Sequence, residues 1–114
     1  MAMKMSEAEL QEAVMAAAQQ LGWRRAHFRP AMTKHGWRTP VSGDGKGFPD
    51  LLLVKGDRLL VVELKAEKGV VSDEQKEWFA AFNGVPCVEV YLWQPADWLN
   101  DTVANVLMKG RPTA

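Results

Sequence analysis

The sequence has only one cysteine, Cys87, among its 114 residues. A single cysteine excludes an internal disulfide, and no pair of Cys and His residues has the spacing of a zinc site. Cys87 lies within an apolar stretch, residues 85–93, so we expect a small buried side chain at this position. Neither a disulfide nor a zinc ion is therefore expected to organise the fold.

The sequence also lacks a long hydrophobic run. No stretch approaches the roughly 18 apolar residues that a membrane-spanning helix needs. The N-terminal region carries Glu7, Glu9 and Glu12, whereas a secretory signal has a continuous apolar segment without such acids. We therefore expect a cytoplasmic protein that has no membrane partner.

Charge of neither sign is in excess, because 14 Lys and Arg residues balance 14 Asp and Glu residues. A net charge of zero argues against a nucleic-acid-binding protein, but residues 24–46 contain six basic residues and one acid, Asp44. A nuclease needs both cations for phosphates and carboxylates for a metal ion. We take one group of residues as candidates for DNA contacts, with a solvated loop as the alternative: Arg24, Arg25, His27, Arg29, Lys34, Arg38 and Lys46.

Length and composition fit a single globular domain over residues 1–114, with 47% apolar and 25% charged residues. Apolar periodicity predicts helices over residues 6–21 and 98–108, and a third between Ser72 and Asn83. Strands are expected over residues 23–29, 51–54, 58–65 and 88–93, and a long loop over residues 30–47. The resulting order, α-β-β-β-α-β-α, predicts an α/β fold with a mixed β-sheet flanked by helices.

Polar residues occur at one end of the predicted hairpin, next to apolar strand residues. Residues i and i+2 of a strand point the same way, so Glu63 and Lys65 share a face. If residues 51–54 pair with residues 60–63, Asp50 lies beside them. A buried carboxylate is costly without a partner, and a bound cation would provide one. The oxygens of Asp50 and Glu63, with the backbone carbonyl of Leu64, suit Mg²⁺; a simple Glu63–Lys65 pair on an edge strand is the alternative.

Three short motifs follow one another along the chain. They are Gly47-Phe48-Pro49-Asp50, Glu63-Leu64-Lys65 and Ser72-x-x-Gln75. This ordered set resembles the PD-(D/E)xK nuclease superfamily, and more narrowly the small stand-alone VRR-NUC proteins of phages and bacteria. The resemblance spans nearly the whole chain. It implies a restriction-endonuclease-like core and a location in the cytoplasm of a bacterium or a phage-infected host.

The resemblance also implies an enzyme, a DNA endonuclease that depends on Mg²⁺ or Mn²⁺ and hydrolyses phosphodiester bonds. Its expected substrates are Holliday junctions or other branched DNA, and its expected active form is a homodimer. By this resemblance Asp50 and Glu63 would bind the metal ion and Lys65 would be catalytic.

Two further catalytic positions follow from the resemblance. Gln75 would contact the metal site or Lys65, although position N3 of a capping box also explains it. An acid of the first helix would complete the site, and Glu7 matches the family best, with Glu9 and Glu12 as competitors.

Other function classes are also compatible with the sequence. A catalytically silent nuclease fold would act as a DNA-binding or assembly module, but such a module commonly loses one of Asp50, Glu63 and Lys65. An unrelated α/β interaction domain would gain no stability from a divalent metal ion, whereas a nuclease that binds the ion only when folded would. Trp23 and Trp37 have two possible roles: they are core residues, or they stack on unpaired bases.

Overall fold

The computed structural model describes residues 4–28, 31–33, 36–38 and 42–109. At its centre is a four-stranded sheet in the order β1-β4-β5-β6. The first three strands pair antiparallel and the last pair, β5 and β6, is parallel. Their bounds are Arg24–His27 for β1, Leu51–Lys55 for β4, Arg58–Leu64 for β5 and Val88–Trp93 for β6. The predicted α/β fold with a mixed sheet is confirmed.

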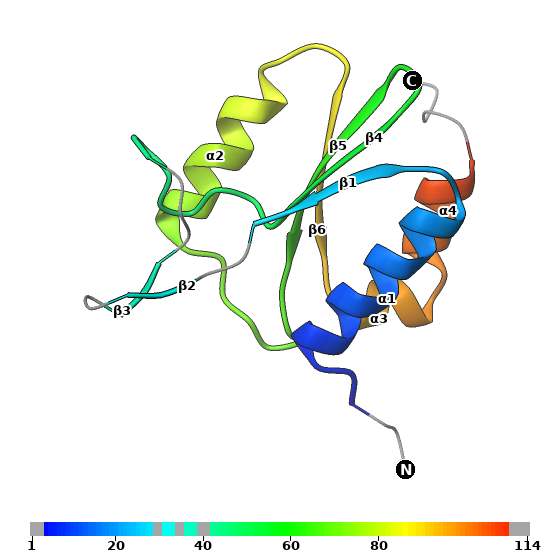
Figure 1. The fold of residues 1–114 in the computed structure, drawn as a ribbon, viewed down its shortest axis with the longest axis horizontal. Helices are drawn as coiled ribbons and strands as arrows, with labels where there is room; N and C mark the ends of the chain where they lie inside the picture. Colours follow the sequence, from blue (N-terminus) through cyan, green and yellow to red (C-terminus); the bar gives the residue numbers. More distant parts are fainter. Residues whose placement is uncertain (1–3, 29–30, 34–35, 39–41, 110–114) are drawn as a thin grey trace.

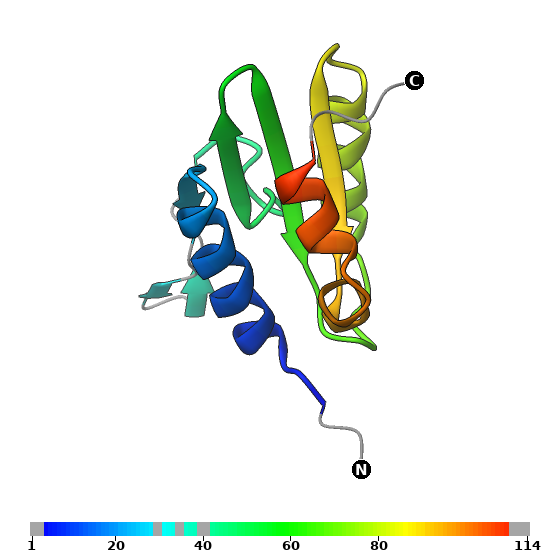
Figure 2. The same ribbon diagram turned by 90° about the vertical axis from the view of Figure 1, so that its right-hand side faces the viewer.

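Helices cover both faces of this sheet. Figure 1 shows α2 on one side and α1, α3 and α4 on the other, and Figure 2 shows α1 and α4 from that second side. None of the helices in the described part of the chain is long and apolar enough to cross a membrane. The helices span Glu7–Gln20 (α1), Asp73–Asn83 (α2), Pro95–Leu99 (α3) and Thr102–Met108 (α4).

Strand β5 separates the hydrophobic core from the other face of the sheet. Leu60, Val62 and Leu64 belong to the core, because alternate residues of a strand face the same side. Val61 and Glu63 alternate with them and are also buried. The remaining core residues come mainly from α1, α4 and β4: Leu10, Val14, Ala18, Trp23, Leu51, Leu53, Trp93, Val103 and Leu107.

The turn between β4 and β5 sets the register of the hairpin. Gly56 has φ +60, which a residue without Cβ adopts freely, and Lys55 pairs with Arg58 across the turn. Leu51 consequently pairs with Val62, one residue away from the predicted register. The predicted hairpin itself is confirmed, and β5 is an internal strand as its apolar faces indicated.

Both long helices begin with a capping box. The side chain of Ser6 accepts from the Glu9 amide and the Glu9 carboxylate accepts from the Ser6 amide, each at 3.1 Å. Ser72 and Gln75 repeat this exchange at the start of α2, with distances of 3.2 and 2.8 Å. The predicted capping box of α2 is therefore confirmed, and both helix starts are fixed locally.

Three expectations from the sequence are wrong. Residues 30–47 were expected to form a loop, yet they contain an antiparallel hairpin of β2 (Ala31–Thr33) and β3 (Gly36–Arg38), outside the main sheet. The helix expected over residues 98–108 is divided into α3 and α4, because Asp101 adopts a left-handed conformation with φ 68. Cys87 is exposed and not buried, since it lies in the turn before β6 with φ 69.

A buried ion pair fixes the end of α4. Arg58 is 8% exposed and donates to both carboxylate oxygens of Glu89 at 2.9 and 2.8 Å. Its Nη1 donates to the backbone oxygens of Val106 and Lys109, at 2.9 Å each. These contacts satisfy carbonyls that have no partner within the helix. Trp23 donates from Nε1 to the Leu107 oxygen at 3.2 Å and is buried, so a base-stacking role for Trp23 is excluded.

Candidate active site

The hairpin brings Asp50 and Glu63 to the same end of the sheet. Because Leu51 pairs with Val62, the preceding residue, Asp50, lies level with Glu63. The Asp50 Oδ2 atom accepts from the Leu64 amide at 2.9 Å, and its backbone oxygen accepts from the Phe28 amide at 2.9 Å. Contacts within the sheet therefore fix the position of Asp50. Only one of its two carboxylate oxygens takes part in these hydrogen bonds.

Glu63 is the most unusual side chain of the site. It is 3% exposed, and its Oε1 accepts a 3.0 Å hydrogen bond from Nε2 of Gln75. When Glu63 is ionised, its Oε2 is buried without a hydrogen-bond partner among the described residues. Burial, a hydrogen bond with the Asp50 carboxyl group in the protonated form and the Asp50 charge raise the pKa of Glu63 to about 9, against the opposing charge of Lys65. An unpaired buried carboxylate oxygen of this kind is costly unless something else binds it.

Lys65 follows directly after β5. Its amide donates to the Trp93 oxygen at 3.0 Å, which ties this residue to the end of β6. Its side chain is half-buried, and its charge acts on both Glu63 and Glu7. The stem of Lys65 also lies close to Gly69, where an added Cβ would meet Lys65 Cβ and Cδ at 3.2 Å. The ammonium group is therefore close enough to both carboxylates to influence their ionisation.

Helix α1 contributes acids to a cavity beside Asp50. The cavity has a volume of about 350 Å³, and Glu7, Glu12, His27, Asp50 and Leu64 are among the residues that line it. Glu9 is occupied in the capping box instead. Burial and the Asp50 charge raise the pKa of Glu7, so this carboxylate is electrostatically part of the site. The geometry therefore favours Glu7 or Glu12 over Glu9.

The donor set fits a hard divalent cation that keeps part of its water shell. Within the described ranges, no three His, Cys, Asp or Glu side chains lie close enough to hold a metal ion without other ligands. Mg²⁺ in proteins commonly takes only one or two carboxylates and fills its remaining positions with water. Asp50 and Glu63 supply two carboxylates. The Oε2 atom of Glu63 has no hydrogen-bond partner in the described part of the chain and is therefore available to a metal ion. The residues present therefore fit such an ion.

The loop before Asp50 is fastened to α2. Trp78 donates from Nε1 to the Asp44 oxygen at 2.9 Å, and Lys46 forms a 3.0 Å ion pair with Glu74. Gly47 has φ +82, and a Cβ there would lie 2.7 Å from backbone and side-chain carbons of Glu74. Only glycine allows this approach. The sequence motif contained the glycine, but its contact with α2 carried no signal in the sequence.

The candidate DNA-contacting residues differ in how far the structure describes them. Arg24 and Arg25 are exposed on the edge strand β1, and Arg25 donates to the Met15 oxygen at 3.2 Å. His27 Nδ1 lies 3.3 Å from Nε2 of Gln11. Gln11 lies one turn after Glu7 on α1 and lines the same cavity as Asp50. Arg29, Lys34 and the side chains of Trp37 and Arg38 lie outside the described part of the chain.

The sequence profile of the VRR-NUC domain matches residues 5–92. The chain belongs to the VRR-NUC family. The match includes α1, strands β1, β4 and β5, nearly all of β6, α2 and every candidate site residue, so the predicted resemblance is confirmed. In a comparison with curated protein sequences, no significant match to the chain was found. A VRR-NUC domain implies a nuclease of the PD-(D/E)xK type, a DNA substrate and a divalent metal cofactor.

Proposed function

We propose that this VRR-NUC protein is a Mg²⁺- or Mn²⁺-dependent DNA endonuclease. Asp50 and Glu63, with the Leu64 carbonyl, would hold the metal ion. The observation that carries this assignment is the buried Oε2 of Glu63, which has no hydrogen-bond partner in the described part of the chain and lies near a second carboxylate. A cation would compensate both negative charges at once.

When bound, the metal ion would act as a Lewis acid toward the scissile phosphate and would favour ionisation of a water molecule. The chain contributes the geometry. Gln75 holds one oxygen of Glu63, and the Leu64 amide holds one oxygen of Asp50. Each carboxylate therefore keeps one oxygen for the ion. Lys65 would stabilise negative charge that develops on the phosphate, because its charge already acts on this site.

Strand β1 leads from the surface toward this site and would bind the DNA backbone. Arg24 and Arg25 are exposed, and His27 lines the cavity that includes Asp50. Lys46 is 84% exposed, and a surface ion pair such as Lys46–Glu74 breaks at little cost when a phosphate competes. Arg29, Lys34 and Arg38 remain proposed contacts of the same basic segment.

Branched DNA is the proposed substrate, and a homodimer is the proposed active form. Symmetric cleavage of a four-way junction requires two active sites related by a two-fold axis. One VRR-NUC domain of this size has a small phosphate-binding surface, and a second copy doubles it. Family membership and this symmetry argument are the supports for the proposal.

The test is cleavage of labelled four-way junction, flap, single-stranded and linear duplex DNA. Each is incubated with Mg²⁺, Mn²⁺ or EDTA and with wild type, Lys65→Ala or Lys76→Ala. Lys76 is an exposed lysine of α2 and serves as the matched control. We expect metal-dependent cleavage that Lys65→Ala abolishes and Lys76→Ala retains. Tight DNA binding without cleavage under all conditions would instead assign the chain as a binding module.

A further inference from the structure

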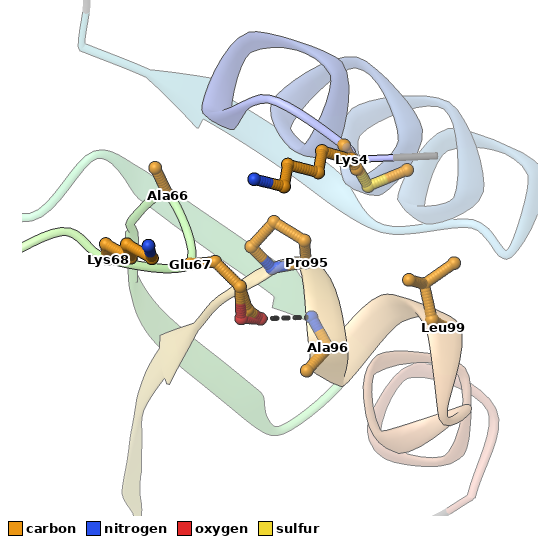
Figure 3. Close-up of a pocket in the computed structure, with 8 residues that line it drawn as sticks. Lys4, Ala66, Glu67, Lys68, Pro95, Ala96 and Leu99 are labelled. Atoms are coloured by element: carbon orange, nitrogen blue, oxygen red, sulfur yellow. Dashed lines mark hydrogen bonds between the residues drawn. The ribbon is translucent and has the colours of Figure 1, made fainter. Parts of the chain in front are cut away.

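An apolar pocket lies beyond the end of β5. Ala66, the residue directly after Lys65 along the chain, is among the residues that line it. Its volume is about 430 Å³, within the range of small-ligand sites. Met5, Pro95 and Leu99 form its apolar wall, and Ala66 and Ala96 leave room between them. Figure 3 shows the Pro95 ring at its centre and Leu99 at one end. None of the described residues that line the pocket is aromatic.

Hydrogen bonds join two segments that line this pocket. Gln94 donates from Nε2 to the backbone oxygens of Ala66 and Glu67, at 3.3 and 3.1 Å. Glu67 in turn accepts from the Ala96 amide at 2.9 Å, which Figure 3 shows beside Pro95. The segment after Lys65 and the start of α3 are therefore joined by three hydrogen bonds. The pocket is formed before any ligand arrives, which lowers the entropic cost of binding.

The charges at the rim select an anionic ligand with an apolar part. Lys4 and Lys68 line the pocket and are exposed, and Figure 3 shows the Lys4 side chain extending over the opening. Among the described residues that line it, the one acid is Glu67, whose carboxylate accepts from the Ala96 amide. Cations around an apolar cavity suit a planar base whose neighbouring phosphates remain outside.

The pocket is also connected to the proposed catalytic centre. Lys65 directly precedes Ala66, and Met5 precedes Glu7 by two residues. The segment that carries Lys65 therefore continues directly into the lining of the pocket. This continuity favours the strand being cut as the source of the ligand.

We infer that this pocket accepts one unpaired nucleobase of the cleaved strand, next to the scissile phosphate. The inference rests on the proposed function and narrows its substrate to DNA with an unpaired nucleotide at the cleavage point. Since the walls offer few polar groups, the base is bound by shape and not by hydrogen-bonded readout. The pocket consequently selects an unpaired base without selecting its sequence.

The first test uses 2-aminopurine placed at single unpaired positions across the branch point of a flap substrate. Binding is measured with wild type and Ca²⁺, which binds the same kind of oxygen ligands as Mg²⁺. Stacking quenches 2-aminopurine, and this pocket has no aromatic ring to restore stacking. We therefore expect emission to rise several-fold at one position and to stay unchanged at the others. Unchanged emission at every position would overturn the inference.

The second test compares Leu99→Glu with Met108→Glu. Both residues are exposed, 67% and 60%, and Met108 does not line the pocket. We expect Leu99→Glu to lose the emission signal and to weaken binding of the unpaired substrate about tenfold, because a carboxylate replaces part of the apolar wall and repels the DNA phosphates. Met108→Glu should leave both unchanged. Ala96→Leu, which fills the pocket without adding charge, should reproduce the Leu99→Glu result.

Three outcomes separate this inference from its alternatives. If Leu99→Glu weakens binding of a fully paired duplex as much as binding of the unpaired substrate, the inference is overturned. The pocket would then contact only the DNA backbone. Dissociation of a dimer by Leu99→Glu in the absence of DNA would assign the surface to a second copy and would also overturn it. If wild type cleaves DNA but emission changes at no position, the base-binding pocket is wrong and the nuclease assignment stands. If emission changes but no substrate is cleaved, the nuclease assignment is wrong and the pocket stands.

Discussion

Gln75 Nε2 lies 3.0 Å from Oε1 of Glu63, while Gln75 Oε1 accepts from the Ser72 amide at 2.8 Å. One side chain thus takes part in the start of α2 and in the orientation of a candidate metal ligand. The two roles use opposite ends of the amide, so they can be separated experimentally.

Gln75→Glu keeps an acceptor for the Ser72 amide but replaces the donor to Glu63 by a third carboxylate. We expect cleavage to fall at least tenfold while thermal stability changes little, because Glu is also a favoured residue at this capping position. Glu9→Gln is the matched control, since Glu9 has the same place in the capping box of α1. If both substitutions reduce cleavage equally, the contact with Glu63 has no role in the reaction.

The raised pKa of Glu63 predicts a pH-dependent stability. Its pKa rises from 4.5 to about 9 on folding. The unionised group is tolerated at low pH, so stability is full below pH 4.5 and declines as pH rises toward 9, by at most about 1.4 kcal/mol per pH unit. Glu63→Gln should remove this slope. Thermal unfolding of both proteins at pH 5 to 9 measures the difference.

Metal binding should act against this decline. An ion that binds ionised Asp50 and Glu63 stabilises the folded state more at pH 8 than at pH 5, because removing the proton from Glu63, whose pKa is about 9, costs less free energy at the higher pH. We expect Mg²⁺ to raise Tm of the wild type at pH 8 and to leave Glu63→Gln nearly unchanged. An equal rise in both proteins would place the ion elsewhere.

The first-helix acids can be distinguished by single substitutions. Glu7→Gln should lower the cleavage rate at limiting Mg²⁺ by roughly tenfold or more, because the Glu7 charge interacts with Asp50 and Lys65. Glu12→Gln, which lines the same cavity, is the control for a general change of charge. A larger loss for Glu12→Gln than for Glu7→Gln would reverse the assignment.

Glu89→Ala should destabilise the protein by about 3–5 kcal/mol, because it leaves the charge of Arg58 buried without its partner. Glu74→Ala removes an acid from an exposed ion pair and should hardly change stability. Denaturant unfolding compares the two variants. Similar midpoints for both would show that the buried pair contributes no more than the exposed one.

Gly47→Ala should cost more stability than Gly43→Ala, although both glycines have positive φ values, 82 and 72. At Gly43 nothing lies within 4 Å of the added Cβ, so only backbone strain remains, about 1–2 kcal/mol. At Gly47 the Cβ would meet Glu74, which adds about 1–3 kcal/mol of overpacking. The clash also displaces the start of α2, so cleavage should fall with Gly47→Ala only.

Period and spacing predicted the strands of the main sheet and the proximity of Asp50 to Glu63 and Lys65, with a register one residue away from the observed one. The role of Gln75 at the site was predicted from the family resemblance. The strand period decides which side chains share a face, and a capping box fixes where Gln75 begins its helix. The sequence leaves the choice among the α1 acids open, because helical spacing alone brings more than one of them toward the sheet.

Other features were hidden because their signals are weak or distant. The β2–β3 hairpin lacks the Asn-Gly or Asp-Gly pair that marks a two-residue turn. The break between α3 and α4 uses Asp101 in a left-handed conformation and a 3.0 Å hydrogen bond from the Thr102 amide to Asn100 Oδ1, with neither Gly nor Pro at the break. Cys87 belongs to an apolar stretch whose first three residues precede the strand.

Side chains alternate along β5 between the core and the active-site face. The length of the Gly56–Asp57 turn therefore affects the active site. Leu60, Val62 and Leu64 enter the core while Val61 and Glu63 face the other way. Inserting one residue in this turn would force the pairing of β4 with β5 to shift, or the turn to bulge. A shift would separate Asp50 from Glu63 without altering any site residue. Insertions here should therefore be far less tolerated over evolution than their exposed position suggests.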